Sequence, residues 1–124
     1  MSWENVTYAM QVNATKGNGY APFFPEARGV DFYVRGNGSV TGGALTIECC
    51  PGNAPMTNVP LLSSGTGWTA LTTIAVPPNA EVRYSAADVV GNVRARISTP
   101  VTGGTVTVTA VRPEEQKGWS RRPS

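Results

Sequence analysis

The side chains that most often transfer protons are sparse in this chain of 124 residues, which contains no histidine. Histidine is the commonest general base and the commonest metal ligand. Among the eight carboxylates, Asp31 and Glu48 fall on the polar faces of expected strands and could meet across paired strands. Such a carboxylate pair is what glycoside hydrolysis requires. Both could equally be ordinary solvated strand residues, and we favour this second interpretation, which predicts a protein without catalytic residues.

The sequence also predicts neither a metal ion nor a cofactor. Oxygen ligands in expected loops are few and scattered: Asn53, Asn58, Asp88 and Asn92. Calcium sites need such ligands in a clustered run. Cys49 and Cys50 are adjacent and lack the CxxC spacing of a zinc site. Because neighbouring residues of a strand point to opposite faces, we expect both cysteines to be reduced rather than joined to each other.

Strands are the main prediction of the hydrophobic pattern, in which apolar and polar residues alternate with a period of two. The expected strands are residues 6–12, 30–35, 45–50, 68–76, 81–85, 93–98 and 105–110. The strand at 68–76 needs a bulge near residues 72–73, where the alternation breaks. The last two strands flank a Pro/Gly segment at 100–104, which predicts a β-hairpin. Residues 53–67 have no periodicity and are expected to form a long loop.

An all-β fold follows from the number and spacing of these strands. Turn signals recur about every ten residues, and no window shows a helical stripe. This arrangement is typical of an antiparallel β-sandwich of the jelly-roll kind. We expect one domain over residues 6–112, with an extended N-terminal arm at 1–5 and an extended C-terminal arm at 113–124, since neither end can bury a core.

The candidate contacts with a partner are tryptophans and arginines. Tryptophan is a typical interface anchor, and arginine suits fixed interface contacts. Two tryptophans lie in the arms, and the alternation places two strand arginines on an outward face: the six candidates are Trp3, Arg94, Arg96, Trp119, Arg121 and Arg122. Two alternatives stay open, namely that Trp119 folds back onto its own domain and that the outward face is simply solvated.

Charge and hydropathy argue against two kinds of partner. The net charge is +2, and no dense Lys/Arg cluster marks a nucleic-acid interface. No apolar run approaches the roughly 18 residues of a membrane span. The N-terminus lacks the basic start and apolar core of a signal peptide, so we expect synthesis in a cytoplasm.

Four segments resemble small virion proteins of tailed bacteriophages: GGALTIE at 42–48, WTALTTI at 68–74, VRARIS at 93–98 and GGTVTVTAV at 103–111. The resemblance covers about two thirds of the chain. It implies a jelly-roll sandwich that decorates or cements a capsid, or that serves at the neck or tail. It carries over no catalytic residue. The chain departs from the pattern between the TIE strand and the tryptophan, where a longer Pro-rich loop replaces an Asp-Gly turn.

The expected function is therefore that of a non-enzymatic structural protein of a phage virion, most simply a capsid decoration or cement protein. Its partners would be the major capsid protein or other virion proteins, and it would form a homo-oligomer. It would be made in the cytoplasm of a host bacterium. The alternatives are a neck or tail accessory protein and a carbohydrate-binding module. Such a module would stack Tyr33 or a loop tryptophan on sugars.

Overall fold

The computed structural model describes residues 3–50 and 68–115, and this part of the chain is all β. Four strands follow one another along the sequence: β1 (Trp3–Ala14), β2 (Phe23–Cys50), β3 (Thr69–Ala75) and β4 (Glu81–Glu115). They form a sheet in the order β1-β4-β2-β3. The predicted all-β fold is confirmed. No helix in the described ranges is long and apolar enough to cross a membrane.

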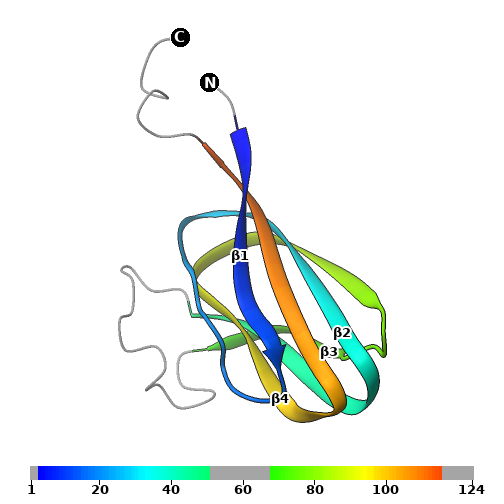
Figure 1. Cartoon of the computed structure of the whole chain (residues 1–124). Coiled ribbons are helices and arrows are strands. Elements are labelled where there is room, and N and C mark those ends of the chain that lie inside the picture. Colours follow the sequence, from blue (N-terminus) through cyan, green and yellow to red (C-terminus); the bar gives the residue numbers. More distant parts are fainter. Residues whose placement is uncertain (1–2, 51–67, 116–124) are drawn as a thin grey trace, which may run out of the picture.

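The longest feature of the sheet is a ladder between β2 and β4. Residues 31–38 of β2 face residues 111–104 of β4, and residues 42–50 face residues 102–92. The partner numbers run in opposite directions, so both stretches are antiparallel. The two strands therefore make a single long ribbon, which appears in Figure 1 as the paired orange-yellow and cyan-green strands.

The predicted hairpin at 92–112 is wrong in its pairing, although the alternation within it is right. Residues 93–97 pair with β2, and so do residues 104–111. The other side of residues 106–111 is occupied by β1. Alternation specifies which face of a strand is buried, but it does not specify which strand lies beside it.

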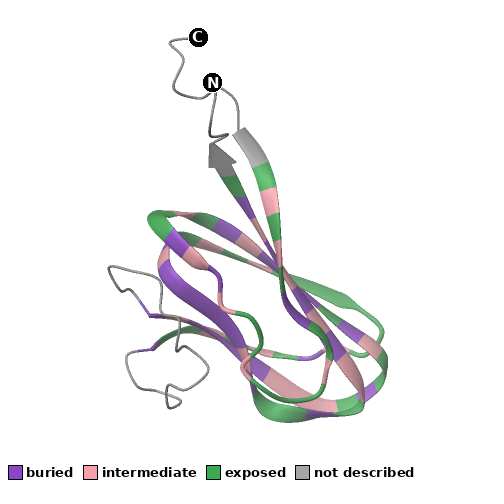
Figure 2. Cartoon of the chain, turned by 60° about the vertical axis from the view of Figure 1, so that its left-hand side comes forward, coloured by how far each residue is buried: buried purple, intermediate pink, exposed green. Residues whose placement is uncertain are grey.

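The ribbon folds over, so that two half-sheets enclose the core. The first half-sheet consists of β1 with residues 30–38, 81–86 and 104–111, and the second consists of β3 with residues 44–50 and 92–99. Buried apolar side chains of both half-sheets form one cluster, which includes Phe32, Val34, Val106, Val108, Leu45, Ile47, Val93 and Ala95. Figure 2 shows this burial as bands that alternate along the strands. The sandwich-like packing that the sequence predicts is therefore present.

Glycines sit where the ribbon bends. β2 continues through residues 36–43 as it passes from one half-sheet to the other. Gly103 has φ = +81°, and a Cβ atom there would collide with the carbonyl oxygen of Ser39. Gly43 has φ = +129°, and a Cβ atom there would lie 2.8 Å from Cα of Val101. The bend therefore depends on residues without side chains.

Hydrogen bonds join the half-sheets along both of their sides. On one side, Gln11 Nε2 donates to the carbonyl oxygen of Ala95 at 2.8 Å. On the other, the turn between β3 and β4 lies against the bend. There the Val76 amide donates to the Gly43 carbonyl at 3.1 Å and the Gly36 amide to the Ala80 carbonyl at 2.9 Å.

The described ends of the chain lie side by side. Trp3 faces Glu115 and Asn5 faces Pro113, so β1 and β4 continue as a two-stranded ribbon beyond the sandwich (Figure 1). The predicted domain limits at residues 6 and 112 stay predictions. Most of the expected C-terminal arm, residues 116–124, and the expected loop at 53–67 lie outside the described residues.

The strand at 69–75 contains the expected irregularity. Ile47 faces Thr72 and Glu48 faces Ala70, which leaves Leu71 as the extra residue of a bulge. The bulge predicted near residues 72–73 is therefore present one residue earlier.

The bend predicts a strong response to substitution at Gly103. We expect Gly103→Ala to lower the free energy of unfolding by about 2 kcal/mol or more, because alanine is strained at positive φ and its Cβ would meet the Ser39 backbone. Gly29→Ala is the matched control, since its Cβ would contact the Ala86 carbonyl oxygen at an ordinary 3.7 Å. Urea denaturation of the three proteins measures the difference. A free energy of unfolding that is no lower in Gly103→Ala than in Gly29→Ala would show that the bend tolerates side chains.

A buried charge cluster as the candidate functional site

Two of the predicted contact residues, Arg94 and Arg96, lie on the second half-sheet beside Glu48. Glu48 faces Arg94 in the β2–β4 register, and Arg96 follows two residues later on the same face. Arg94 Nε donates to Glu48 Oε1 at 2.8 Å, and Arg96 Nη2 donates to Glu48 Oε2 at 2.9 Å. Both carboxylate oxygens of Glu48 are therefore held by arginine.

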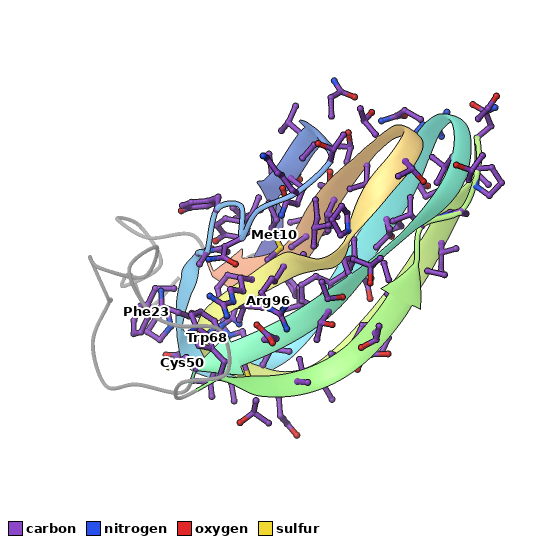
Figure 3. The ribbon with its side chains drawn as sticks, turned by 90° about the horizontal axis from the view of Figure 1, so that it is seen from below. Met10, Phe23, Cys50, Trp68 and Arg96 are labelled. Carbon is purple, nitrogen blue, oxygen red and sulfur yellow. The ribbon has the colours of Figure 1, made fainter. Side chains whose placement is uncertain are left out.

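The prediction that Arg94 points outward into solvent is wrong, because its side chain is 0% exposed. The guanidinium lies over the ring of Trp68, with 4.0 Å from Cζ to the ring centroid. Trp68 also packs with Cys50 and Ala21 in a small second apolar cluster. Figure 3 shows Trp68 and Cys50 at the same end of the molecule. This end of the half-sheet is thus covered on both faces, and Arg94 and Glu48 on its outer face are enclosed.

Arg96 occupies the edge of this cluster. Its side chain keeps 23% exposure, compared with 5% for Glu48. The hydrogen bond that Arg96 donates to Glu48 is the main reason why the pKa of Arg96 is raised above its ordinary value. Arg96 is therefore the more accessible of the two strand arginines, although its charge is already paired.

The environment of Glu48 contains opposing effects on its pKa. Burial alone raises the pKa of this carboxyl, but the hydrogen bonds and positive charges of Arg96 and Arg94 outweigh burial and lower it. Glu48 is consequently ionised at neutral pH and has no proton to donate. Asp31 lies in the first half-sheet, where it accepts a hydrogen bond from Ser85. The carboxylate pair that Asp31 and Glu48 could have formed is not assembled.

Arg94 depends on Glu48 for its hydrogen bonding. Its Nη1 and Nη2 atoms are buried without a hydrogen-bond partner in the described part of the chain, as is Nε1 of Trp68. A buried charge without such compensation is costly. The contacts that the structure gives this guanidinium are therefore the Glu48 carboxylate and the Trp68 ring.

The two adjacent cysteines are free thiols, as the sequence predicts. Cys49 packs against the main core, whereas Cys50 belongs to the second cluster with Trp68. Their opposite orientation follows from the alternation of side chains along a strand. Burial, with a smaller contribution from the neighbouring Cys50, raises the pKa of the Cys49 thiol.

Arg112 is a buried residue that the sequence analysis did not single out. Its side chain donates to the carbonyl oxygen of Val89 at 3.0 Å and to that of Glu26, and its Cζ lies 4.2 Å from the centre of the Phe24 ring. It therefore fastens the start of β2 to β4. In the sequence, Arg112 occupies the next inward position after the alternating residues 106–110. This position was the available signal of a buried arginine, but a solvated arginine at the end of a strand produces the same pattern.

Trp3, another of the predicted contact residues, is not brought to this cluster. Trp3 lies in β1, opposite Glu115, in the ribbon that extends from the first half-sheet. Trp119, Arg121 and Arg122 lie outside the described residues. Over residues 3–50 and 68–115, no group of three His, Cys, Asp or Glu side chains could hold a metal ion.

Comparison by sequence finds no matching family model and no matching curated protein. Comparison by structure finds proteins with the same fold. The SPBc2 prophage-derived protein YomS is 18% identical, with a TM-score of 0.57 over 92% of this chain and 96% of YomS. The PBSX exported protein XepA is 15% identical, with a TM-score of 0.64 over 92% of this chain but only 39% of XepA. The fold is thus shared with a prophage-derived protein and with part of an exported protein of PBSX.

The charge cluster predicts a large effect of neutralising Glu48. We expect Glu48→Gln to lower the free energy of unfolding at pH 7 by about 3 kcal/mol, because it leaves the Arg94 charge buried and uncompensated. Glu81→Gln, at an exposed position of β4, is the control and should change it by less than about 0.5 kcal/mol. Guanidinium chloride denaturation measures both.

The native protein and Glu48→Gln, compared at several pH values, test the lowered pKa of Glu48. Because the folded pKa is lower than the unfolded one, ionisation stabilises the fold above about pH 4.3, the ordinary value. This contribution disappears as the pH falls through the folded pKa. The difference between the native protein and Glu48→Gln should therefore shrink in acid. A difference that stays constant down to pH 2 would contradict the lowered pKa.

The thiol environment predicts slow modification of Cys49. We expect iodoacetamide to label Cys49 in the folded protein more slowly than in urea-unfolded protein at pH 8, because the raised pKa leaves less thiolate. Peptide mass spectrometry of timed samples gives the rate of labelling in the folded and in the unfolded protein. Equal rates in folded and unfolded protein would contradict the prediction.

Proposed function

We propose that this chain is a structural protein of a phage or phage-derived particle. The observation that supports this proposal best is the fold shared with YomS, which extends over nearly the whole length of both chains. The PBSX exported protein XepA contains a region of the same fold. The sequence resemblance to small virion proteins points to the same class.

Within this class, we assign the chain the role of a capsid decoration or cement protein that assembles as a homo-oligomer. Such a protein needs a rigid scaffold and surfaces that hold its neighbours. The scaffold is the bent ribbon, closed along both sides by hydrogen bonds. Several weak contacts per subunit, repeated over a lattice, give strong attachment through avidity.

The structure changes which surfaces can make those contacts. Arg94 is enclosed and leaves the set of contact residues, while the partly exposed Arg96 stays in it. The other proposed contacts are Trp3, Trp119, Arg121 and Arg122. The outer strands add new ones, because β1 and β3 are the first and last strands of the sheet. Exposed apolar side chains lie on them, with Val12 on β1 and Leu71 on β3. Edge strands of this kind pair readily with another chain.

The test of the proposed class is the protein content of purified particles. We expect mass spectrometry of phage particles whose genome encodes this chain to find it at a copy number close to that of the capsid subunit or an integral fraction of it. Absence of the chain from the particles would overturn the proposed function.

The test of the proposed attachment is sedimentation with particles that lack the chain. A protein that ends after Glu115 keeps the ribbon pairing of Trp3 with Glu115 and loses residues 116–124. We expect this protein, and the full chain with Trp119, Arg121 and Arg122 changed to alanine, to stay unbound at concentrations where the native chain binds. Thermal unfolding of all three proteins serves as the control for the fold. Binding by the truncated protein would show that the edges suffice.

A further inference from the structure

A pocket lies on the first half-sheet, which does not contain the charge cluster. Its volume is about 430 Å³, within the range of about 300–1,000 Å³ that is typical of small-molecule sites. The first half of β2 contributes Asp31, the start of β4 contributes Ser85 and Ala87, and the end of β4 contributes Val111 and Pro113. Because β2 alternates, Asp31 points away from the core that contains its neighbours.

The polar side of the pocket is held in position by hydrogen bonds. Ser85 Oγ donates to Asp31 Oδ1 at 2.6 Å and accepts from Arg83 Nε at 3.2 Å. Arg83 Nε also lies 3.9 Å from Asp31 Oδ1. These contacts fix the Asp31 carboxylate, whose side chain is 37% exposed. Its second oxygen, Oδ2, has no hydrogen bond within the described residues and can accept one from a ligand.

The rest of the lining is mainly apolar. Ala87, Val111 and Pro113 contribute aliphatic surface, and Val111 is the register partner of Asp31 in β4. A sugar ring has matching chemistry, since it presents hydroxyl groups at its rim and C–H groups on its faces. The hydroxyls would donate to Oδ2 of Asp31 and to the remaining lone pair of Ser85 Oγ, while the C–H face would lie on the aliphatic surface. Convergent polar groups in a mainly apolar pocket are typical of ligand sites.

We propose that this pocket binds one neutral sugar unit of a glycan. Charge argues for a neutral ligand, because the Asp31 carboxylate repels an acidic sugar and the nearby Arg83 reduces the attraction for an amine. Tyr33 lies two residues after Asp31, on the same face of β2, and is partly exposed. Its ring offers a surface against which an adjoining sugar unit can stack.

The test is titration of the ¹⁵N-labelled full chain with methyl β-glucoside, methyl β-galactoside and methyl N-acetyl-β-glucosaminide. We expect at least one of them to shift the amide signals of Asp31, Ser85 and Ala87 in a saturable way. Asp31→Ala should raise the dissociation constant at least tenfold. Ala87→Phe should abolish binding by filling the pocket while it leaves Asp31 in place. Glu81→Gln, an exposed acidic residue outside the pocket, should bind as the native chain does.

The outcomes separate this proposal from its alternatives. If Asp31→Ala does not fold, Ala87→Phe decides the result. Unshifted pocket amides with all three glycosides would overturn the proposal, and so would native affinity in Ala87→Phe. Glucosamine hydrochloride and glucuronate are titrated as charged controls. A response confined to either of them would assign the pocket to a charged ligand and would also overturn the proposal of a neutral sugar. Because particle content is measured separately, failure here leaves the proposed structural function unaffected.

Discussion

The architecture depends on one constraint, which is that two long strands stay hydrogen-bonded to each other while they bend together. Residues 31–50 and 92–111 keep antiparallel pairing on both sides of the bend. The bend requires backbone atoms to approach more closely than side chains allow, and Gly43 and Gly103 permit this approach. Once the ribbon is folded, each half supplies one wall of the core, and the other strands extend those walls.

The charge cluster is a consequence of the same arrangement. The second half-sheet is covered on its inner face by the core, and the Trp68 ring lies over Arg94 on its outer face. Arg94 and Glu48 therefore lose contact with water although they point outward. Glu48 and Arg94 are opposite each other in the ladder and compensate each other's charge. The first half-sheet keeps an accessible outer face, and Asp31 and Ser85 lie there. The two carboxylates thus have different environments because the two half-sheets are covered differently.

The alternation of residues predicted which face of each strand is buried better than it predicted which strands lie side by side. Val93 and Val106 are buried as the alternation indicates, because a period of two is a local property of the chain. Their partners in β2 depend on contacts between residues some 40 to 70 positions apart, which local patterns do not encode. Arg94 occupies an outward position in the pattern, and its burial beneath the Trp68 ring depends on the three-dimensional fold. The Asp31 pocket was likewise hidden, since its walls come from three separate segments.

The ribbon formed by the two ends has a mechanical meaning. Trp3 and Glu115 are neighbours in an antiparallel ladder, so the described ends leave the sandwich at the same pole. Tension applied between them would separate β1 from β4 one pair at a time, like a zipper, rather than shear many hydrogen bonds at once. Tension shared equally by both ends would instead pull the two strands in the same direction and leave their pairing unloaded. The fold is therefore suited to being anchored through both ends to one body.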